Sequence, residues 1–190
     1  MIYMFLAPGF EEVEALAPLD LLRRAGLSVT TVAITEPASE HAVTGSHGIT
    51  VLADMSTEAF GRYALSGEAD RPVEAVILPG GMPGTTNLEA SPTVDAALKL
   101  AEGQGAYLCA ICAAPLVLGK RGYLAGKRAT CYPGFESYLE GATVGGKVIR
   151  DGRVITAAGM GVAQEFGLEM VSVLVSPEKA DEIRRAIQSL

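Results

Sequence analysis

The stretch that decides the fold is Gly105-Ala-Tyr-Leu-Cys-Ala-Ile-Cys-Ala-Ala114. Its first part, residues 105–111, is a continuous apolar run, which predicts a strand buried on both faces, as in parallel sheets. The pattern from Ala113 to Arg121 predicts a short helix directly after it. A reactive side chain on a sharp strand-to-helix turn needs small neighbours, because bulky ones would not tolerate the backbone strain. We therefore expect a nucleophile elbow with Cys112 at the turn.

Similar alternating patterns flank this stretch on both sides. They predict strands over residues 2–7, 28–34, 73–78, 147–150 and 153–156 and helices over residues 11–25, 92–102, 164–175 and 177–190. A small antiparallel excursion is expected within residues 42–52, and residues 54–70 are expected to be irregular surface with one short helix. Strands that alternate with helices predict an α/β fold built on a doubly wound, mostly parallel sheet.

Composition bounds the class of protein. The chain has 190 residues, of which 49% are hydrophobic, and this is enough to build a core without metals or disulfides, so one domain over residues 1–190 is expected. The net charge of -7 argues against binding to nucleic acid or to an anionic membrane surface, since both need clustered Lys and Arg. The apolar run over residues 2–7 is too short to span a membrane.

Cysteine usage indicates the compartment. The three cysteines, Cys109, Cys112 and Cys131, are an odd number without zinc-ligand spacing or a signal peptide, which predicts reduced thiols in the cytoplasm. The sequence contains no P-loop, dinucleotide-binding or zinc-protease motif, so no cofactor is expected.

Three sharp turns follow predicted strands and are expected to meet at one crevice. They are Pro8-Gly9, Pro79-Gly80-Gly81 and the turn at Cys112, and reactive groups collect at the carboxyl ends of strands in such sheets. The helix that follows Cys112 favours a thiolate and is expected to lower its pKa. The backbone N–H groups of Ala113 and Gly81 are expected to hold an oxyanion.

Glu14 is the carboxylate to single out. It aligns with Pro18, Leu21, Leu22 and Ala25 on one otherwise apolar stripe of the first predicted helix. A carboxylate in that position is expected to be buried, with a raised pKa, and to give a hydrogen bond to the Cys112 thiolate or a proton to a reacting carbonyl.

Purely structural roles are the alternative to the catalytic roles proposed for these residues. Glu11 and Glu12 are read as solvated charges of the first helical turn. Cys112 could be a small buried hydrophobe, the commoner state of a cysteine inside cells, although its small neighbours favour a reactive thiol. Cys109 is read as core. Cys131 is read as a partly buried loop residue, with a resolving thiol as the alternative.

The motifs resemble one known family over nearly the whole chain. They are Ala7-Pro-Gly-Phe-Glu-Glu-Val-Glu14, Leu22-Arg-Arg-Ala-Gly26, Leu78-Pro-Gly-Gly81, Ala110-Ile-Cys-Ala113 and Gly159 to Phe166. In this order they are similar to the ThiJ/PfpI family, and within it to the deglycase branch. The resemblance implies a flavodoxin-like three-layer sandwich, a homodimer, a reactive Cys112 with Glu14 as its partner, and oxyanion amides at Gly81 and Ala113, next to Gly80.

The chain departs from the branch at two positions. Tyr132 stands where the branch has a histidine before Pro133, and tyrosine is a poor base near pH 7. His47 stands where branch members often carry an arginine near the site, whereas Arg24 keeps its counterpart. Anion binding there is therefore expected to be weaker and dependent on pH.

Three functions follow, in order of preference. The first is a cofactor-independent glyoxalase or deglycase in which Cys112 attacks a small reactive carbonyl compound, or its adduct, and Glu14 moves the proton. The second is a redox sensor or chaperone-like stress protein that uses oxidation of Cys112. The third is a cysteine peptidase, which would need a base such as a His47 contributed across a dimer interface.

Overall fold

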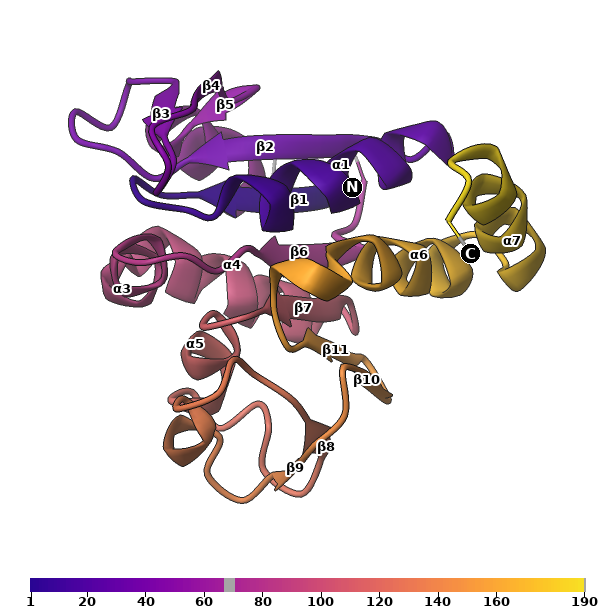
Figure 1. The fold of residues 1–190 in the computed structure, drawn as a ribbon. Helices are drawn as coiled ribbons and strands as arrows, with labels where there is room; N and C mark the ends of the chain where they lie inside the picture. Colours follow the sequence, from indigo (N-terminus) through magenta and orange to yellow (C-terminus); the bar gives the residue numbers. More distant parts are fainter. Residues whose placement is uncertain (67–70, 190) are drawn as a thin grey trace.

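The computed structural model describes residues 1–66 and 71–189, and its centre is a seven-stranded sheet. The strands are β1 (Ile2–Leu6), β2 (Val29–Ala33), β5 (Met55–Ser56), β6 (Ala75–Leu78), β7 (Tyr107–Ile111), β10 (Val148–Asp151) and β11 (Val154–Ala157). Their order across the sheet is β10-β11-β7-β6-β1-β2-β5 (Figure 1). Every pair is parallel except β10 and β11. The prediction of a mostly parallel α/β fold is confirmed.

Helices cover both faces of the sheet. One face carries α1 (Glu12–Arg24), α6 (Ala163–Leu174) and α7 (Pro177–Ala186), and the other carries α2 (Thr57–Phe60), α3 (Gly84–Ala90), α4 (Pro92–Gly103) and α5 (Pro115–Gly119). Figure 1 shows α1 beside α6 on the near face. Among the described residues, no helix is both long enough and apolar enough to cross a membrane.

Side-chain alternation in β1 explains why both faces are covered. Ile2, Met4 and Leu6 pack into the core beneath α1 and α6, whereas Tyr3 and Phe5 pack into the core on the opposite face. Successive side chains of a strand point to opposite faces, so a strand that is apolar throughout needs a layer on each side. The three-layer arrangement follows from this pattern.

Two smaller sheets lie outside the central one. They consist of β3 (Ala42–Thr44) with β4 (Thr50–Leu52), and of β8 (Arg128–Ala129) with β9 (Thr143–Val144). Single turns of other helix types are found at Gly61–Leu65, Glu136–Tyr138 and Met160–Val162. The antiparallel excursion within residues 42–52 is confirmed.

The structure differs from the prediction in three local details. The region over residues 54–66 is more ordered than expected, because β5 adds to the edge of the central sheet and is followed by α2 and a π-helical turn. Residues 67–70, the end of the segment predicted to be irregular, lie outside the described residues. Helix α3 was not predicted, since its Gly-Thr-Thr-Asn start has weak helix propensity. The helix predicted over residues 113–121 is regular only over α5.

Candidate active site

Cys112 occupies the sharp turn that the sequence predicts. It follows β7 and has a φ of 65°, a left-handed conformation rare for a residue with a side chain. Its N–H donates to the Ala157 carbonyl at 2.8 Å, and its own carbonyl accepts from the Tyr132 N–H at 2.7 Å. These two bonds hold a conformation that costs about 1–3 kcal/mol. The half-buried thiol is therefore presented at the carboxyl end of the sheet.

The first turn of α1 positions Glu14 against this thiol. The Glu11 side chain caps the helix by accepting from the Glu14 N–H at 2.6 Å, and the Glu11 N–H donates to the Gly80 carbonyl at 2.9 Å. The Glu14 side chain is only 1% exposed. Its Oε2 accepts from the Gly80 N–H at 3.1 Å, and its carboxyl group also forms hydrogen bonds with the Cys112 side chain and the Met160 backbone.

Glycine is required where the β6 turn meets these two side chains. A Cβ on Gly80 would lie 2.5 Å from Glu14 Oε2 and 2.6 Å from Cys112 Cβ. Gly81 has a φ of 88°, which glycine adopts without steric cost. The backbone N–H groups of Gly81 and Ala113 both form hydrogen bonds to the Cys112 sulfur. These two amides favour the ionised form of the Cys112 thiol; their expected role as oxyanion donors stays a prediction.

Burial raises the pKa values of both Glu14 and Cys112. Burial raises the pKa of Glu14 to about 7, against the hydrogen bonds that favour its ionised form. Burial, followed by the charge of Glu14, raises the pKa of Cys112 to about 12, and the amides of Ala113 and Gly81 only partly oppose this. The expectation of a lowered Cys112 pKa is therefore wrong, because burial and the adjacent carboxylate outweigh the helix amino end.

Glu12 forms a second, separate arrangement with His47. Its Oε2 lies 2.9 Å from His47 Nδ1, and its Oε1 accepts from the His47 N–H at 2.7 Å. Burial disfavours the ionised form of Glu12, but these hydrogen bonds prevail and lower its pKa to about 2. The expectation that Glu12 is solvated is wrong, since it is only 4% exposed; the imidazole of His47, by contrast, is largely exposed.

Tyr132 borders the Glu14–Cys112 pair, whereas Arg24 does not. The Tyr132 ring is about half exposed and lies beside Gly159, where a Cβ would be 3.4 Å from Tyr132 Cδ2 and 3.9 Å from Glu14 Oε1. Arg24 is ten residues further along α1 than Glu14, a rise of about 15 Å, and it pairs with Asp20 instead. Within one chain Arg24 therefore lies away from the pair, and its expected place near the site at a dimer interface stays a prediction.

The remaining thiols are inert by burial. Cys109 is fully buried in the core, as expected, and burial raises its pKa strongly. Cys131 is 6% exposed, and burial raises its pKa to about 11. The sequence reading missed the part that Met160 plays as a backbone donor to Glu14; the Gly159-Met160-Gly161 loop before α6 was the available signal.

One group of possible metal ligands exists among the described residues. The ligand atoms of Glu11, Glu12 and His47 lie within 4.8 Å of one another. The hydrogen bonds between Glu12 and His47 and the capping role of Glu11 account for this geometry, so the group carries no metal assignment.

The fold and this geometry together define a class of protein, the parallel α/β sandwiches with a cysteine on a strained strand-to-helix turn beside a buried carboxylate. The chain belongs to the DJ-1/PfpI family, whose family model matches residues 1–173.

Relatives support this assignment over nearly the whole chain. The chain is 35% identical to "Protein dj-1beta" of Drosophila melanogaster over 191 residues, which cover 97% of this chain and 94% of the relative. It is 33% identical to "Glutathione-independent glyoxalase DJR-1.2" of Caenorhabditis elegans over 181 residues, covering 93% and 89%. The structure of oxidized Toxoplasma gondii DJ-1 superimposes with a TM-score of 0.88 at 30% identity, covering 98% and 97% of the two chains.

Proposed function

We propose that this protein is a cofactor-independent enzyme of the glyoxalase or deglycase type, acting on methylglyoxal-like α-oxoaldehydes or their adducts. The observation that carries the proposal is the hydrogen-bonded pair of Cys112 and the buried Glu14 at the strained turn. A relative named as a glutathione-independent glyoxalase supports the same chemistry. The broader role is protection against carbonyl and oxidative stress.

The first chemical step is addition of the thiol to the aldehyde. Glu14 accepts the thiol proton while the Cys112 sulfur bonds to the aldehyde carbon, and it then passes this proton to the carbonyl oxygen, which gives a hemithioacetal and regenerates the carboxylate. The amides of Gly81 and Ala113 stabilise the negative charge on that oxygen during the step. A Glu14 pKa of about 7 suits this role, because a base is most effective when its pKa lies near the operating pH.

The second step is an internal proton transfer. Glu14 removes the proton from the former aldehyde carbon and returns it to the neighbouring ketone carbon, while the hydroxyl proton of the hemithioacetal passes to the ketone oxygen; the product is a thioester of the hydroxy acid. Water then hydrolyses the thioester, so that methylglyoxal and one water give lactate and the free thiol. The sequence is redox-neutral, so no electron carrier is needed, and one carboxyl group suffices as acid and base.

The test is lactate production from methylglyoxal by the freshly reduced protein, with the loss in buffer subtracted. Cys112→Ala is expected to abolish it. Tyr132→His, the residue that the deglycase branch carries, is expected to change turnover by less than about tenfold, since the Tyr132 side chain is half exposed and no step requires it. Absence of turnover in the reduced protein would contradict the proposal, most clearly if Tyr132→His restored it.

A redox sensor or chaperone-like stress protein is the second candidate. Here two equivalents of hydrogen peroxide would oxidise Cys112 to the sulfenate and then the sulfinate, each releasing water. A protonated Glu14 would donate a hydrogen bond to the sulfinate, and its raised pKa favours this. Slow turnover together with stoichiometric oxidation of Cys112 would favour this candidate.

A cysteine peptidase is the third candidate, and the geometry gives it little support. In the part of the chain that the structure describes, neither histidine hydrogen-bonds to Cys112; His47 binds Glu12, and His41 binds the Ala53 carbonyl. A His47 from a second copy of the chain would be needed as the base. Cleavage of a casein substrate that is lost in His47→Gln would favour this candidate.

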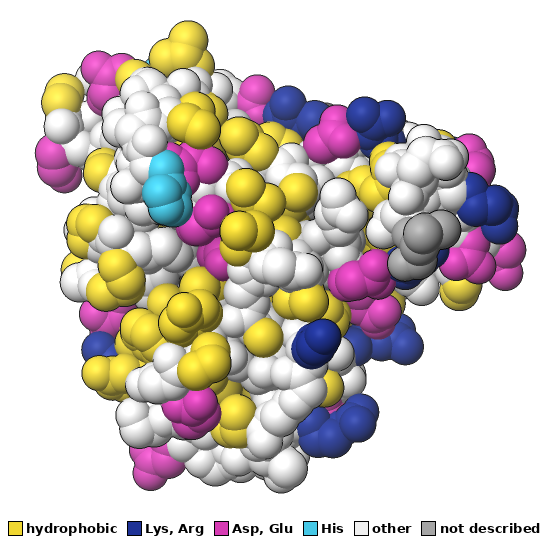
Figure 2. Space-filling model, in the orientation of Figure 1, with side chains coloured by type: hydrophobic (Ala, Val, Ile, Leu, Met, Phe, Trp, Pro, Cys, Tyr) yellow, Lys and Arg dark blue, Asp and Glu magenta, His cyan; other side chains and the backbone are white. Residues whose placement is uncertain are grey.

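We also propose a cytoplasmic homodimer. Figure 2 shows hydrophobic side chains gathered on the face that carries α1 and α6. Val13, which precedes Glu14 in sequence, and Met160, whose backbone contacts the Glu14 carboxyl group, are 44% and 53% exposed. An exposed apolar face of this kind favours association. Light scattering at micromolar concentration should give twice the mass of one chain.

A further inference from the structure

A cavity lies at the end of the sheet opposite to Cys112. It has a volume of about 630 Å³ and opens at the amino ends of β7 and β11, where Leu108 and Val154 line it. Leu108 precedes Cys112 by four residues, or about 13 Å along a strand. The cavity is therefore separate from the candidate active site, and its size is typical of small-molecule sites.

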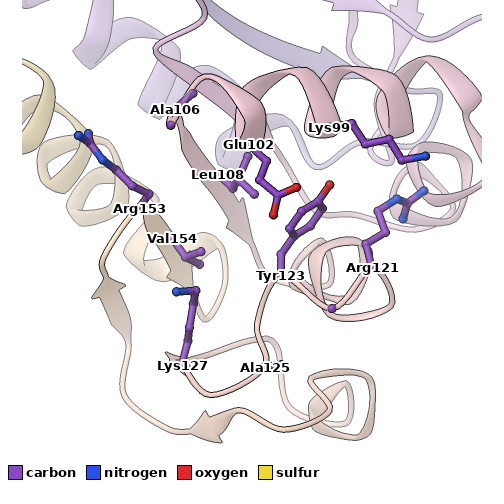
Figure 3. A pocket seen from close by; sticks show the side chains of 12 residues that line it. Lys99, Glu102, Ala106, Leu108, Arg121, Tyr123, Ala125, Lys127, Arg153 and Val154 are labelled. Carbon is purple, nitrogen blue, oxygen red and sulfur yellow. The ribbon is translucent and has the colours of Figure 1, made fainter.

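Basic side chains dominate the charged lining. Lys99, Arg121, Lys127 and Arg153 all border the cavity, whereas Glu102 is the one acidic residue among the lining residues (Figure 3). The chain as a whole carries a net charge of -7. The local excess of positive charge thus opposes the overall balance and favours an anionic ligand.

The cations on the two sides of the cavity differ. Asp95 lies 2.7 Å from Lys99 and 3.2 Å from Arg121, so it neutralises part of their charge. Arg121 also donates to two backbone carbonyls, which fixes it as a structural residue. Among the ion pairs of the described residues, by contrast, none involves Lys127 or Arg153. The uncompensated charge is therefore on the side of the β10–β11 turn.

Lys127 is the best placed of these cations. Its side chain is half-buried, and its Nζ lies 4.0 Å from the position that a Cβ on Gly152 would take, beside the start of β11. Figure 3 shows this ammonium group directed toward Val154. The neighbouring Arg153 guanidinium lies 4.6 Å from the centre of the Tyr107 ring. A bound anion would form charge-assisted hydrogen bonds with the Lys127 ammonium group, which takes part in no ion pair of the described residues.

The rest of the lining is apolar or aromatic. Leu108, Ala125, Val154 and the ring of Tyr123 form walls next to Lys127. We propose that this cavity binds a small organic anion, with its carboxylate or phosphate on Lys127 and an apolar or aromatic body against Leu108, Val154 and Tyr123. The site requires none of the Cys112 chemistry, so it stands independently of the proposed enzyme activity.

The test is a titration of ¹⁵N-labelled protein followed by NMR. The probes are phenyl phosphate, phenylacetate and the neutral benzyl alcohol. Both anions are expected to shift the Leu108, Tyr123 and Val154 amides saturably, and benzyl alcohol is expected to bind at least about fivefold more weakly. The tighter of the two anions identifies the headgroup as phosphate or carboxylate. Equal affinity for benzyl alcohol, or shifts confined to the surroundings of Cys112, would overturn the proposal.

Variants test the assigned contact directly. Lys127→Gln is expected to weaken anion binding at least about fivefold, whereas Glu102→Gln, which removes a repulsive charge, is expected to tighten it about twofold. Lys147→Gln changes an exposed lysine outside the cavity and serves as the control, with less than about a twofold effect expected. Unchanged affinity in Lys127→Gln would overturn the assignment, and so would an equal loss in Lys147→Gln.

Discussion

Two carboxylates in the same turn of α1 have opposite environments. Glu14 is enclosed by Gly80, the Cys112 thiol and the Met160 backbone, and burial raises its pKa to about 7. Glu12 is also buried, but hydrogen bonds from His47 lower its pKa to about 2. Burial alone therefore does not decide ionisation; the partners do. Only Glu14 is placed to accept and return protons near neutral pH.

Neutralising each carboxylate in turn should give the largest difference. Glu14→Gln is expected to lower kcat for lactate formation by about 10²–10⁴-fold, the usual contribution of a positioned general acid or base. Glu12→Gln, the matched control two residues away, is expected to lower it by less than about tenfold, since it lacks contact with the thiol. Equal losses of kcat in the two variants would contradict the assignment of Glu14, and not Glu12, as the acid and base.

A methyl group added beside each carboxylate tests how rigidly it is held. In Gly80→Ala the new Cβ meets Glu14, Cys112 Cβ and the Ile111 carbonyl, so overpacking should lower the free energy of unfolding by about 2–3 kcal/mol. In Gly45→Ala the three atoms nearest to the new Cβ all belong to the Glu12 side chain, and we expect a loss of about 1 kcal/mol. Urea unfolding of both variants measures the difference, and the reverse order would contradict the account.

Removing the His47 imidazole should have the smallest effect, and that effect should depend on pH. Hydrogen bonding and charge from Glu12 raise the pKa of His47 above its ordinary value. The stabilising contribution of the protonated imidazole is then fully present below about pH 6.5, the pKa of histidine in the unfolded chain. It is lost as the pH rises through the higher pKa of His47 in the folded protein. Thermal unfolding of His47→Gln should show a lower Tm than the parent at pH 5.5 and nearly the same Tm at pH 9. A constant difference would exclude this linkage.

The sequence predicts the main features of the site because they arise from local patterns. The apolar run before Cys112 and its small neighbours specify the turn, and the apolar stripe on the first helix specifies that Glu14 is buried. The glycines in the turns after β1 and β6 allow the backbones of these two turns to approach closely at Gly80 and Gly81. Each of these is a short-range signal with a single physical meaning.

Other features depend on contacts that are distant in sequence. Glu12 is buried because the loop containing His47 folds over it. The Cys112 pKa rises because the thiol is buried and because Glu14, 98 positions earlier, lies beside it. The first strand–helix unit of the chain supplies that carboxylate, whereas the β7 turn supplies the thiol. Helix α3 and strand β5 were missed for a different reason, since their short and weakly biased sequences form only through tertiary packing.

The central claim is that Cys112 and Glu14 act as one proton-transferring pair, and the most direct measurement is the pH dependence of Cys112 alkylation by iodoacetamide. The rate should be followed on the Cys112 peptide by mass spectrometry in the parent protein and in Glu14→Gln. The parent rate is expected to rise through a pH of about 7, the pKa of Glu14, and then to level off. In Glu14→Gln the rate should keep rising without that plateau, whereas the same profile in both proteins would contradict the account.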